Sequence, residues 1–261
     1  MRPIQQLEFD DKSCKVGLIV LSEVFEQRKI RTTSGSFTSF IPLETPSGAQ
    51  WTESDLEAKL VRQLAFSPAV YDLITQPILN YRLDGKARRY TPDIAVQILS
   101  DVDEPAALFL IEVKRKAELQ RKSTSRDLRF HVGRLAAASI GGEFRVMTED
   151  EILTPYLTNA RRFSRYRDGG VYDETVVACR RAVGSVLPAT VGEVTELLYG
   201  ITADMVEASD IVAKMIAYRM VLVDLSKQVA DSSVLRHAPI GEGTDPRGDA
   251  IIKMLFSAKA E

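Results

Sequence analysis

Apolar positions in the middle of the chain predict two neighbouring strands. Residues 106–113 (AALFLIEV) form an almost unbroken apolar run, which is typical of a strand buried on both faces in the middle of a sheet. Residues 93–98 predict a second strand, with Pro92 at its start and the carboxylate of Asp93 at its entrance. Side chains alternate across a strand, so Glu112 and Lys114 share one face. If the two strands are adjacent, Asp93 and Glu112 come together.

A helical pattern upstream adds a third carboxylate. In residues 53–66 apolar side chains recur at helical spacing, namely Leu56, Leu60, Val61 and Leu64. Glu57 falls within this apolar stripe, so the helix directs a glutamate toward the core. A buried carboxylate without a partner is costly, which favours a partner charge, a metal ion or a water-filled cleft. The alternative is a glutamate at the edge of the stripe that reaches solvent.

These acids and the lysine fit a metal site for phosphodiester hydrolysis. Mg²⁺ takes oxygen ligands and often draws on one or two carboxylates plus a substrate phosphate, and a nearby lysine can orient or deprotonate the attacking water. We therefore predict that Glu57, Asp93 and Glu112 bind Mg²⁺, with the Val113 carbonyl as a further ligand, Mn²⁺ as a substitute and Lys114 as a catalytic partner. The competing interpretation is a surface aspartate at a turn and a frayed strand end, because both short motifs are common by chance.

Composition narrows the functional classes. The 261 residues are 45% hydrophobic and 27% charged, which is typical of a globular protein with one core of about 150 to 170 residues and a small second domain. No apolar stretch approaches the roughly 20 residues of a membrane span and no signal-peptide pattern is present, so we expect a cytoplasmic protein. With two cysteines (Cys14, Cys179) and two histidines (His131, His237), a disulfide framework, a cysteine zinc site and a histidine-based nuclease are disfavoured.

Charge is distributed unevenly along the chain. The net charge is −2, yet residues 81–181 carry 19 Lys and Arg against 15 Asp and Glu. Within this part the basic residues form three clusters: Arg82, Lys86, Arg88 and Arg89; Arg115, Lys116, Arg121 and Lys122; and Arg161, Arg162, Arg165 and Arg167. Such clusters suit phosphate contacts, although any single arginine more often lies on a solvated helix face.

Five segments carry a resemblance to a known family. They are SDLE at 54–57, YDLITQP at 71–77, RYTPD at 89–93, IEVK at 111–114 and TEDEI at 148–152. On these motifs the chain resembles the TnsA-type endonuclease subunit of heteromeric, Tn-seven-like transposases, in the PD-(D/E)XK nuclease superfamily. The resemblance implies an α/β restriction-endonuclease-like core with a mixed central sheet, followed by a small winged-helix-like domain. It also implies catalytic roles for Glu57, Asp93, Glu112 and Lys114, and it leaves open whether Gln76 serves the site or only a turn.

Local patterns complete the expected element order. Residues 16–25 and 36–43 predict strands, and Asp84-Gly85 predicts a hairpin turn. A single helix is expected over 118–139, and a further one from Pro155 to about residue 167. Glycines 169 and 170 then indicate a domain boundary.

Three domains are expected. They are a nuclease catalytic domain in residues 1–170, a winged-helix-like domain in 171–237, and a flexible tail in 238–261 with an apolar partner-binding segment. A capping box at 190–193 and a helix near 203–218 favour the winged helix, although this helix is not strongly basic and an interaction domain without groove contacts fits equally well. The apolar end either docks back on the protein or is captured by a partner. The resemblance favours capture by a TnsC-like ATPase.

The leading hypothesis is therefore a metal-dependent DNA endonuclease. The resemblance implies that it cleaves the 5′ ends of a transposon during cut-and-paste transposition, together with a TnsB-like transposase and a TnsC-like ATPase regulator. The residues by themselves support only hydrolysis of a phosphodiester. Two alternatives stay open: a stand-alone restriction or repair endonuclease, and a non-catalytic DNA-binding adaptor.

Overall fold

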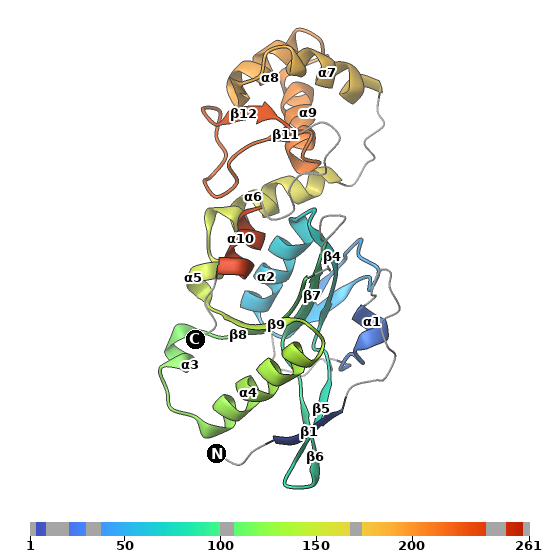
Figure 1. Cartoon of the computed structure of the whole chain (residues 1–261). Coiled ribbons are helices and arrows are strands. Elements are labelled where there is room, and N and C mark those ends of the chain that lie inside the picture. The colour runs from blue at the N-terminus through green and yellow to red at the C-terminus, as the bar shows by residue number, and fades with distance from the viewer. Residues whose placement is uncertain are drawn as a thin grey trace. The chain divides into compact units, whose positions relative to one another are not determined.

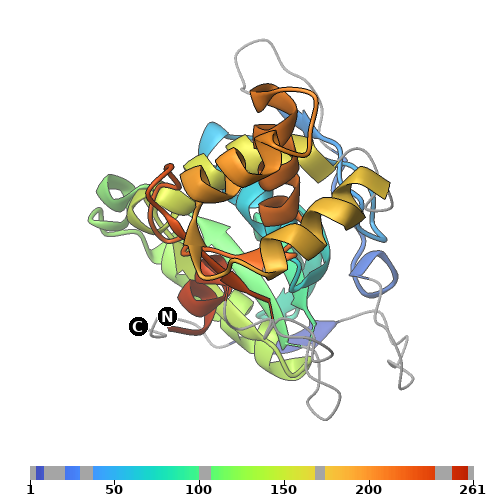
Figure 2. The same cartoon turned by 90° about the horizontal axis from the view of Figure 1, so that it is seen from above.

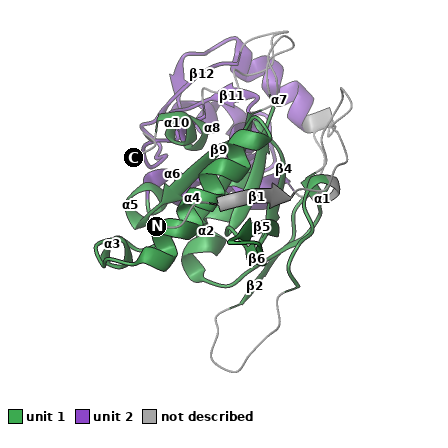
Figure 3. Ribbon diagram, turned by 60° about the horizontal axis from the view of Figure 1, so that its bottom comes forward, with its two compact units in different colours: residues 1–153, 251–261 green, residues 154–250 purple. Residues whose placement is uncertain are grey.

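The computed structural model separates the chain into two compact units (Figure 1, Figure 3). It describes residues 4–8, 21–29, 38–99, 107–167, 174–238 and 249–257. Unit 1 comprises residues 1–153 together with 251–261, and unit 2 comprises residues 154–250. The division falls before the helix that begins at Pro155, whereas the sequence placed this helix in the first domain.

A four-stranded mixed sheet is the centre of unit 1. Its strand order is β4 (Val70–Thr75), β7 (Ile94–Ile98), β8 (Ala107–Val113) and β9 (Glu143–Met147). β8 is antiparallel to β7 and parallel to β9, and its apolar run is buried as expected for an inner strand. The mixed sheet and the pairing of the two predicted strands are thus confirmed.

A second sheet of unit 1 contains the predicted hairpin. It joins β1 (Ile4–Glu8), β5 (Leu79–Leu83) and β6 (Lys86–Tyr90) in antiparallel order. Asp84 and Gly85 connect β5 to β6 with φ angles of 52° and 75°, the left-handed conformation that a two-residue hairpin turn requires. A further pair is formed by β2 (Ser39–Ile41) and β3 (Gln50–Thr52).

Several helices of unit 1 begin at side-chain caps. α2 (Asp55–Phe66) starts at Ser54, whose hydroxyl accepts from the amide of Glu57. The predicted helix over 118–139 is wrong as a single element, because Ser123 caps a new helix and splits the segment into α3 (Lys116–Leu119) and α4 (Thr124–Ser139). α4 packs against β8 and β9 through a buried cluster that includes Leu110, Phe130 and Phe144. α5 (Glu149–Ile152) follows β9 with a complete capping box.

The N-terminal expectation is only partly met. β2 falls within the predicted strand at 36–43, but Leu21–Val24 forms a short helix, α1, where a strand was expected. Asp72 of β4 accepts a hydrogen bond from the amide of Leu21 at 3.2 Å, which caps this helix from 51 residues away. The spacing of apolar residues near Leu21 cannot reveal this hydrogen bond to a distant strand. The remainder of the predicted strand, residues 16–20, lies outside the described residues.

The apolar C-terminal segment docks on unit 1. α10 (Ala250–Ser257) buries Ile251, Ile252 and Leu255. The Phe256 ring meets Phe109 of β8 edge to face at 5.2 Å between ring centroids, and Nε of Arg145 donates to the carbonyl of Leu255 at 3.1 Å. Of the two alternatives that the sequence left open, docking on the protein itself is the one seen here.

Unit 2 combines helices with a small sheet. After α6 (Pro155–Phe163) and a turn of 3₁₀ helix come α7 (Glu174–Gly184), α8 (Val191–Tyr199) and α9 (Met205–Ala217), which can be followed by colour in Figure 1 and Figure 2. The sheet has the order β10 (Ala189–Thr190), β12 (Val234–His237) and β11 (Val221–Leu222), all antiparallel. The capping box predicted at Thr190 and Glu193 is present. In neither unit is a described helix long and apolar enough to cross a membrane.

Candidate active site

Three oxygen atoms predicted as metal ligands converge on one cation. The Nζ of Lys114, just after β8, lies 2.8 Å from Glu112 Oε1, 3.0 Å from the carbonyl oxygen of Val113 and 3.5 Å from Asp93 Oδ2. Asp93 and Glu112 are 8% and 5% exposed, so both acids are almost completely removed from water, whereas the Lys114 side chain is 25% exposed. The structure therefore brings together Asp93, Glu112, Val113 and Lys114, as the sequence predicts.

Strand pairing produces the convergence. Ile94 of β7 is opposite Ile111 of β8 in an antiparallel pair, which places the preceding Asp93 opposite the following Glu112. Oδ2 of Asp93 accepts from the amide of Val113 at 2.7 Å and continues the ladder through a side chain. On the other side, the amide of Lys114 donates to the carbonyl of Met147 at 3.0 Å. The backbone that carries the site is thus fixed by both neighbouring strands.

Burial and mutual repulsion perturb the ionisation of the cluster. Burial, and next the charge of Glu112, raise the pKa of Asp93 to about 7, against the opposing influence of Lys114. Burial by itself disfavours the ammonium of Lys114, but Asp93 and Glu112 outweigh it and hold the Lys114 pKa above its ordinary value. Lys114 is therefore a cation at neutral pH in this arrangement, which offsets the charge of the two acids.

Gln76 contacts Asp93 from the end of β4. Its Nε2 lies 3.4 Å from Asp93 Oδ1, and its amide donates to the Asp93 carbonyl at 2.9 Å. Its Oε1 accepts from Arg28 at 2.6 Å, and the same guanidinium nitrogen pairs with Glu53 at 2.5 Å. Gln76 has φ of 55°, an uncommon conformation for a residue other than glycine and one that clusters at functional sites. It thus serves both the turn and the carboxylate.

Glu57 is buried, as its place in the apolar stripe predicts. It is 7% exposed, and its Oε2 accepts from the amide of Glu53 at 3.0 Å. Burial raises the pKa of Glu57, while hydrogen bonds from Glu53 and Ser54 oppose the shift. The charge of Glu57 also contributes to the raised pKa of Asp93, so the two carboxylates sense each other. In this conformation, however, the Glu57 carboxylate helps to cap the start of α2.

The donor set suits a hard divalent cation. Two buried carboxylates and a backbone carbonyl are the oxygen ligands that Mg²⁺ prefers, and they already surround a positively charged nitrogen. Within the described ranges no three Asp, Glu, His or Cys side chains are grouped closely enough to hold a metal.

Tyr90 is a site residue that the sequence reasoning missed. It ends β6, is 4% exposed, and donates its hydroxyl hydrogen to Glu112 Oε2 at 2.6 Å. Burial and the charge of Glu112 raise the pKa of Tyr90 well above its ordinary value, so the phenol keeps its proton. The available signal was the position of this tyrosine close to the Pro-Asp motif, since a buried tyrosine usually requires a hydrogen-bond partner.

Basic side chains of unit 1 lie on elements that lead into the site. In β6, Lys86, Arg88 and Arg89 are exposed immediately before Tyr90. Beyond β8, Arg115 and Lys116 are also exposed, and Lys116 pairs with Asp150. The third predicted basic cluster, which begins at Arg161, lies in unit 2.

The third basic cluster belongs to unit 2, where part of it has internal partners. Arg162 donates to the carbonyl of Val229 at 2.8 Å, and Arg167 donates to that of Ala217 at 3.2 Å. These two arginines therefore stabilise unit 2, and they are weaker candidates for phosphate contacts than the exposed residues of β6.

Comparison with known families identifies the segment that carries most of this site. Residues 67–149 match the family described as TnsA-like endonuclease N terminal. This segment is similar to the N-terminal domain of TnsA-like endonucleases. The match includes Asp93, Glu112 and Lys114, as well as Gln76 and Tyr90, whereas Glu57 precedes it. No curated protein matches the chain.

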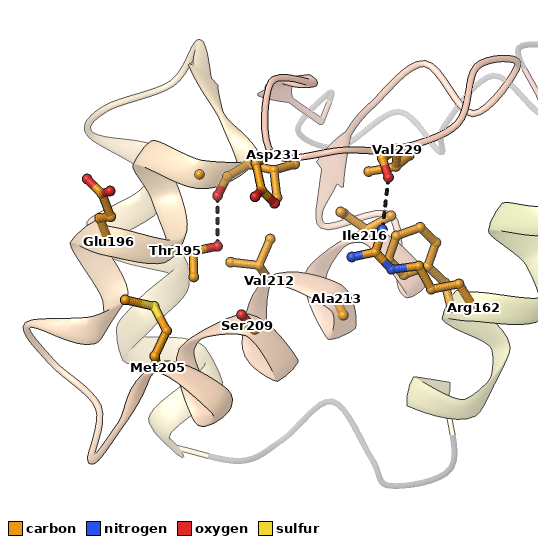
Figure 4. A pocket seen from close by; sticks show the side chains of 13 residues that line it. Arg162, Thr195, Glu196, Met205, Ser209, Val212, Ala213, Ile216, Val229 and Asp231 are labelled. Carbon is orange, nitrogen blue, oxygen red and sulfur yellow. Dashed lines mark hydrogen bonds between the residues drawn. The ribbon is translucent and has the colours of Figure 1, made fainter.

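A separate hollow lies within unit 2 (Figure 4). It has a volume of about 250 Å³ and is lined in part by Phe163, Val212 and Ile216, with Arg162 and Asp231 also at its wall. None of the predicted catalytic residues contributes to its lining. The hollow is therefore separate from the cluster of Asp93, Glu112 and Lys114.

Proposed function

We propose that the protein is a metal-dependent DNA endonuclease whose site is formed by Asp93, Glu112 and Lys114, with Glu57 as a further acid. The observation that carries the proposal is the convergence of Asp93, Glu112 and the Val113 carbonyl on a single cation, within a segment that matches an endonuclease family. Endonuclease activity on DNA is what the family itself implies. Dependence on Mg²⁺, with Mn²⁺ as a substitute, is our inference from the donor set.

The residues of the site would divide the chemistry among them. A divalent cation held by Asp93, Glu112 and the Val113 carbonyl would neutralise charge on the scissile phosphate and lower the pKa of a bound water. Lys114, which is protonated in the metal-free arrangement, would orient the attacking water and offset negative charge in the transition state. Gln76 and the Val113 amide hold Asp93 in place, so the ligand is oriented before the cation binds.

The β5–β6 hairpin is the best-placed candidate for a DNA contact. Arg88 and Arg89 are exposed and lie two residues and one residue before Tyr90, which itself contacts Glu112. At a rise of about 3.3 Å per residue, both are within about 7 Å of Tyr90 along the strand. A DNA backbone bound along this strand would lead directly to the carboxylates.

The biological role that we propose follows from the family. TnsA-like endonuclease domains point to Tn-seven-like transposition. We infer that the protein cleaves the 5′ ends of a transposon during cut-and-paste movement, with a TnsB-like transposase acting on the 3′ ends and a TnsC-like ATPase as regulator. Duplex DNA at the transposon ends is the proposed substrate.

Unit 2 is proposed to be a winged-helix-like module. Its order of helix, short strand, two helices and two strands, from α7 through β12, supports this assignment. The first half of α9 exposes Met205 and Val206 together with the acidic Glu207 and Asp210. An acidic and apolar face is repelled by phosphates, which favours a protein contact over insertion into a DNA groove.

The decisive experiment is cleavage of transposon-end DNA with and without Mg²⁺ and partner proteins. Our proposal predicts 5′ cuts that require Mg²⁺ and that depend on a TnsB-like and a TnsC-like protein. Equal cleavage in the absence of partners would favour a stand-alone restriction or repair enzyme. DNA binding without any cleavage under all conditions would favour the adaptor and contradict the proposal.

A further inference from the structure

Both oxygens of the Glu112 carboxylate have a fixed donor, and the two donors differ in charge. Oε1 faces the ammonium of Lys114 at 2.8 Å, while Oε2 accepts the hydrogen bond from the Tyr90 hydroxyl at 2.6 Å. Oε1 therefore lies beside the same ammonium group that Asp93 and the Val113 carbonyl also approach. Oε2 faces a neutral and buried group, because Tyr90 is 4% exposed.

The ring and the hydroxyl of Tyr90 have separable roles. The ring belongs to the buried cluster of unit 1 that includes Leu79, Ala95 and Leu110, and a phenylalanine would preserve this packing. The hydroxyl extends from that cluster to Glu112, and a hydrogen bond from a neutral donor stabilises a buried carboxylate in one orientation. Without this hydrogen bond the Glu112 carboxylate can rotate about its last side-chain torsion, because torsions of this kind have a broad distribution.

We propose that Tyr90 is a positioning residue for the metal site, whose hydroxyl holds Oε2 of Glu112 so that Oε1 faces the cation. The inference rests on the proposed nuclease function, because it assigns Oε1 to the divalent cation. Tyr90 acts through Glu112 and does not touch the reacting atoms. Loss of its hydroxyl should weaken cation binding while the fold and the DNA surface are preserved.

The test is a calorimetric titration of Mg²⁺ into the full-length protein and its Tyr90→Phe variant, without DNA. Outer-shell partners of metal ligands typically contribute about 10- to 100-fold in affinity, and we expect a loss of this size. Tyr81→Phe is the matched control: Tyr81 lies in the same buried cluster, on β5, two residues after Leu79, the residue that is paired with Tyr90. This control should bind Mg²⁺ like the wild type.

Cleavage kinetics separate positioning from a structural role. At a fixed, limiting Mg²⁺ concentration, Tyr90→Phe should lower kcat and leave KM for DNA unchanged, and raising the Mg²⁺ concentration should restore kcat. In a Glu112→Gln background, adding Tyr90→Phe should change Mg²⁺ affinity no further, because the hydroxyl acts through the carboxylate. A further loss in that background would refute the inference.

The outcomes distinguish this inference from the function on which it rests. If the wild type binds Mg²⁺ and Tyr90→Phe binds it equally well, the positioning role is refuted and the nuclease proposal stands. If the wild type binds neither Mg²⁺ nor Mn²⁺, both proposals fall. A Tyr90→Phe variant that melts far below Tyr81→Phe would show the hydroxyl to be a structural group and would also refute the inference.

Discussion

Substituting Ile252 by alanine tests whether the C-terminal helix is part of the folded core. Ile252 lies in α10, is 0% exposed, and is flanked by the buried Ile251 and, three residues on, Leu255. The substitution leaves the helix propensity high and removes three carbon atoms from a fully enclosed position. Its effect therefore reports on tertiary docking and not on formation of the helix.

The expected magnitude follows from the burial. Replacing a buried isoleucine by alanine costs about 2–5 kcal/mol, the sum of the lost transfer free energy and the cavity left behind. For a domain of about 150 to 250 residues, each kcal/mol lowers Tm by about 2–4 °C. We therefore expect Ile252→Ala to lower the Tm of unit 1 by about 4–20 °C. Mg²⁺ affinity should change little, because the site is formed by β7 and β8.

The assay is a thermal melt of Ile252→Ala beside Lys253→Ala. Lys253 is the next residue of the same helix and is exposed, so its substitution controls for changes in the helix itself. We expect Lys253→Ala to melt within about 2 °C of the wild type, since surface substitutions usually change stability by less than about 0.5 kcal/mol. Equal melting of the two variants would refute docking of α10. Loss of binding to a TnsC-like ATPase in Ile252→Ala, without a change in Tm, would instead support the partner-binding role.

Three further predictions concern the site. Lys114→Ala should abolish 5′ cleavage while 3′ nicking and joining by the transposase continue, as read on denaturing gels of transposition intermediates; double-strand cuts in this variant would contradict the role of Lys114. Mg²⁺ affinity should fall as pH drops from 8 to 6, by up to about tenfold per pH unit below 7, because Asp93 with a pKa of about 7 must release its proton to bind a cation. In the metal-free protein the same raised pKa has the opposite consequence: the folded state retains a proton that the unfolded state loses near 3.8, so stability should fall as pH rises from 4 to 7. A pH-independent Mg²⁺ affinity measured by calorimetry would show that Asp93 is not a ligand.

Local sequence patterns predicted the elements that position the carboxylates. The apolar run of β8 and the position of Pro92 define two strands, and side-chain alternation places Glu112 and Lys114 on one face. The buried position of Glu57 followed from a helical stripe in the same way. These features depend on residues that are close together in the chain, so they can be recognised in a single sequence.

Contacts between distant segments were not predictable in this way. Arg28 and Gln76 are 48 residues apart, and the hydrogen bond between Tyr90 and Glu112 depends on how the β5–β6 hairpin meets the central sheet. Likewise, the helix at Leu21 depends on a cap from Asp72, and the docking of α10 depends on the face that β8 presents. Periodicity identifies which side chain is buried, but it does not identify the partner that it meets.

The most direct test of the central claim is a calorimetric titration of Mg²⁺ into the wild type and the Asp93→Ala variant, with Asp127→Ala as the control. Asp127 is an acidic residue on the solvent side of α4, with a side chain 60% exposed. Asp93 lies where Glu112, the Val113 carbonyl and Lys114 converge, so its loss should weaken Mg²⁺ binding by at least about tenfold. The Asp127→Ala control should bind like the wild type. Unchanged Mg²⁺ affinity in Asp93→Ala would contradict the metal site and the nuclease mechanism built on it.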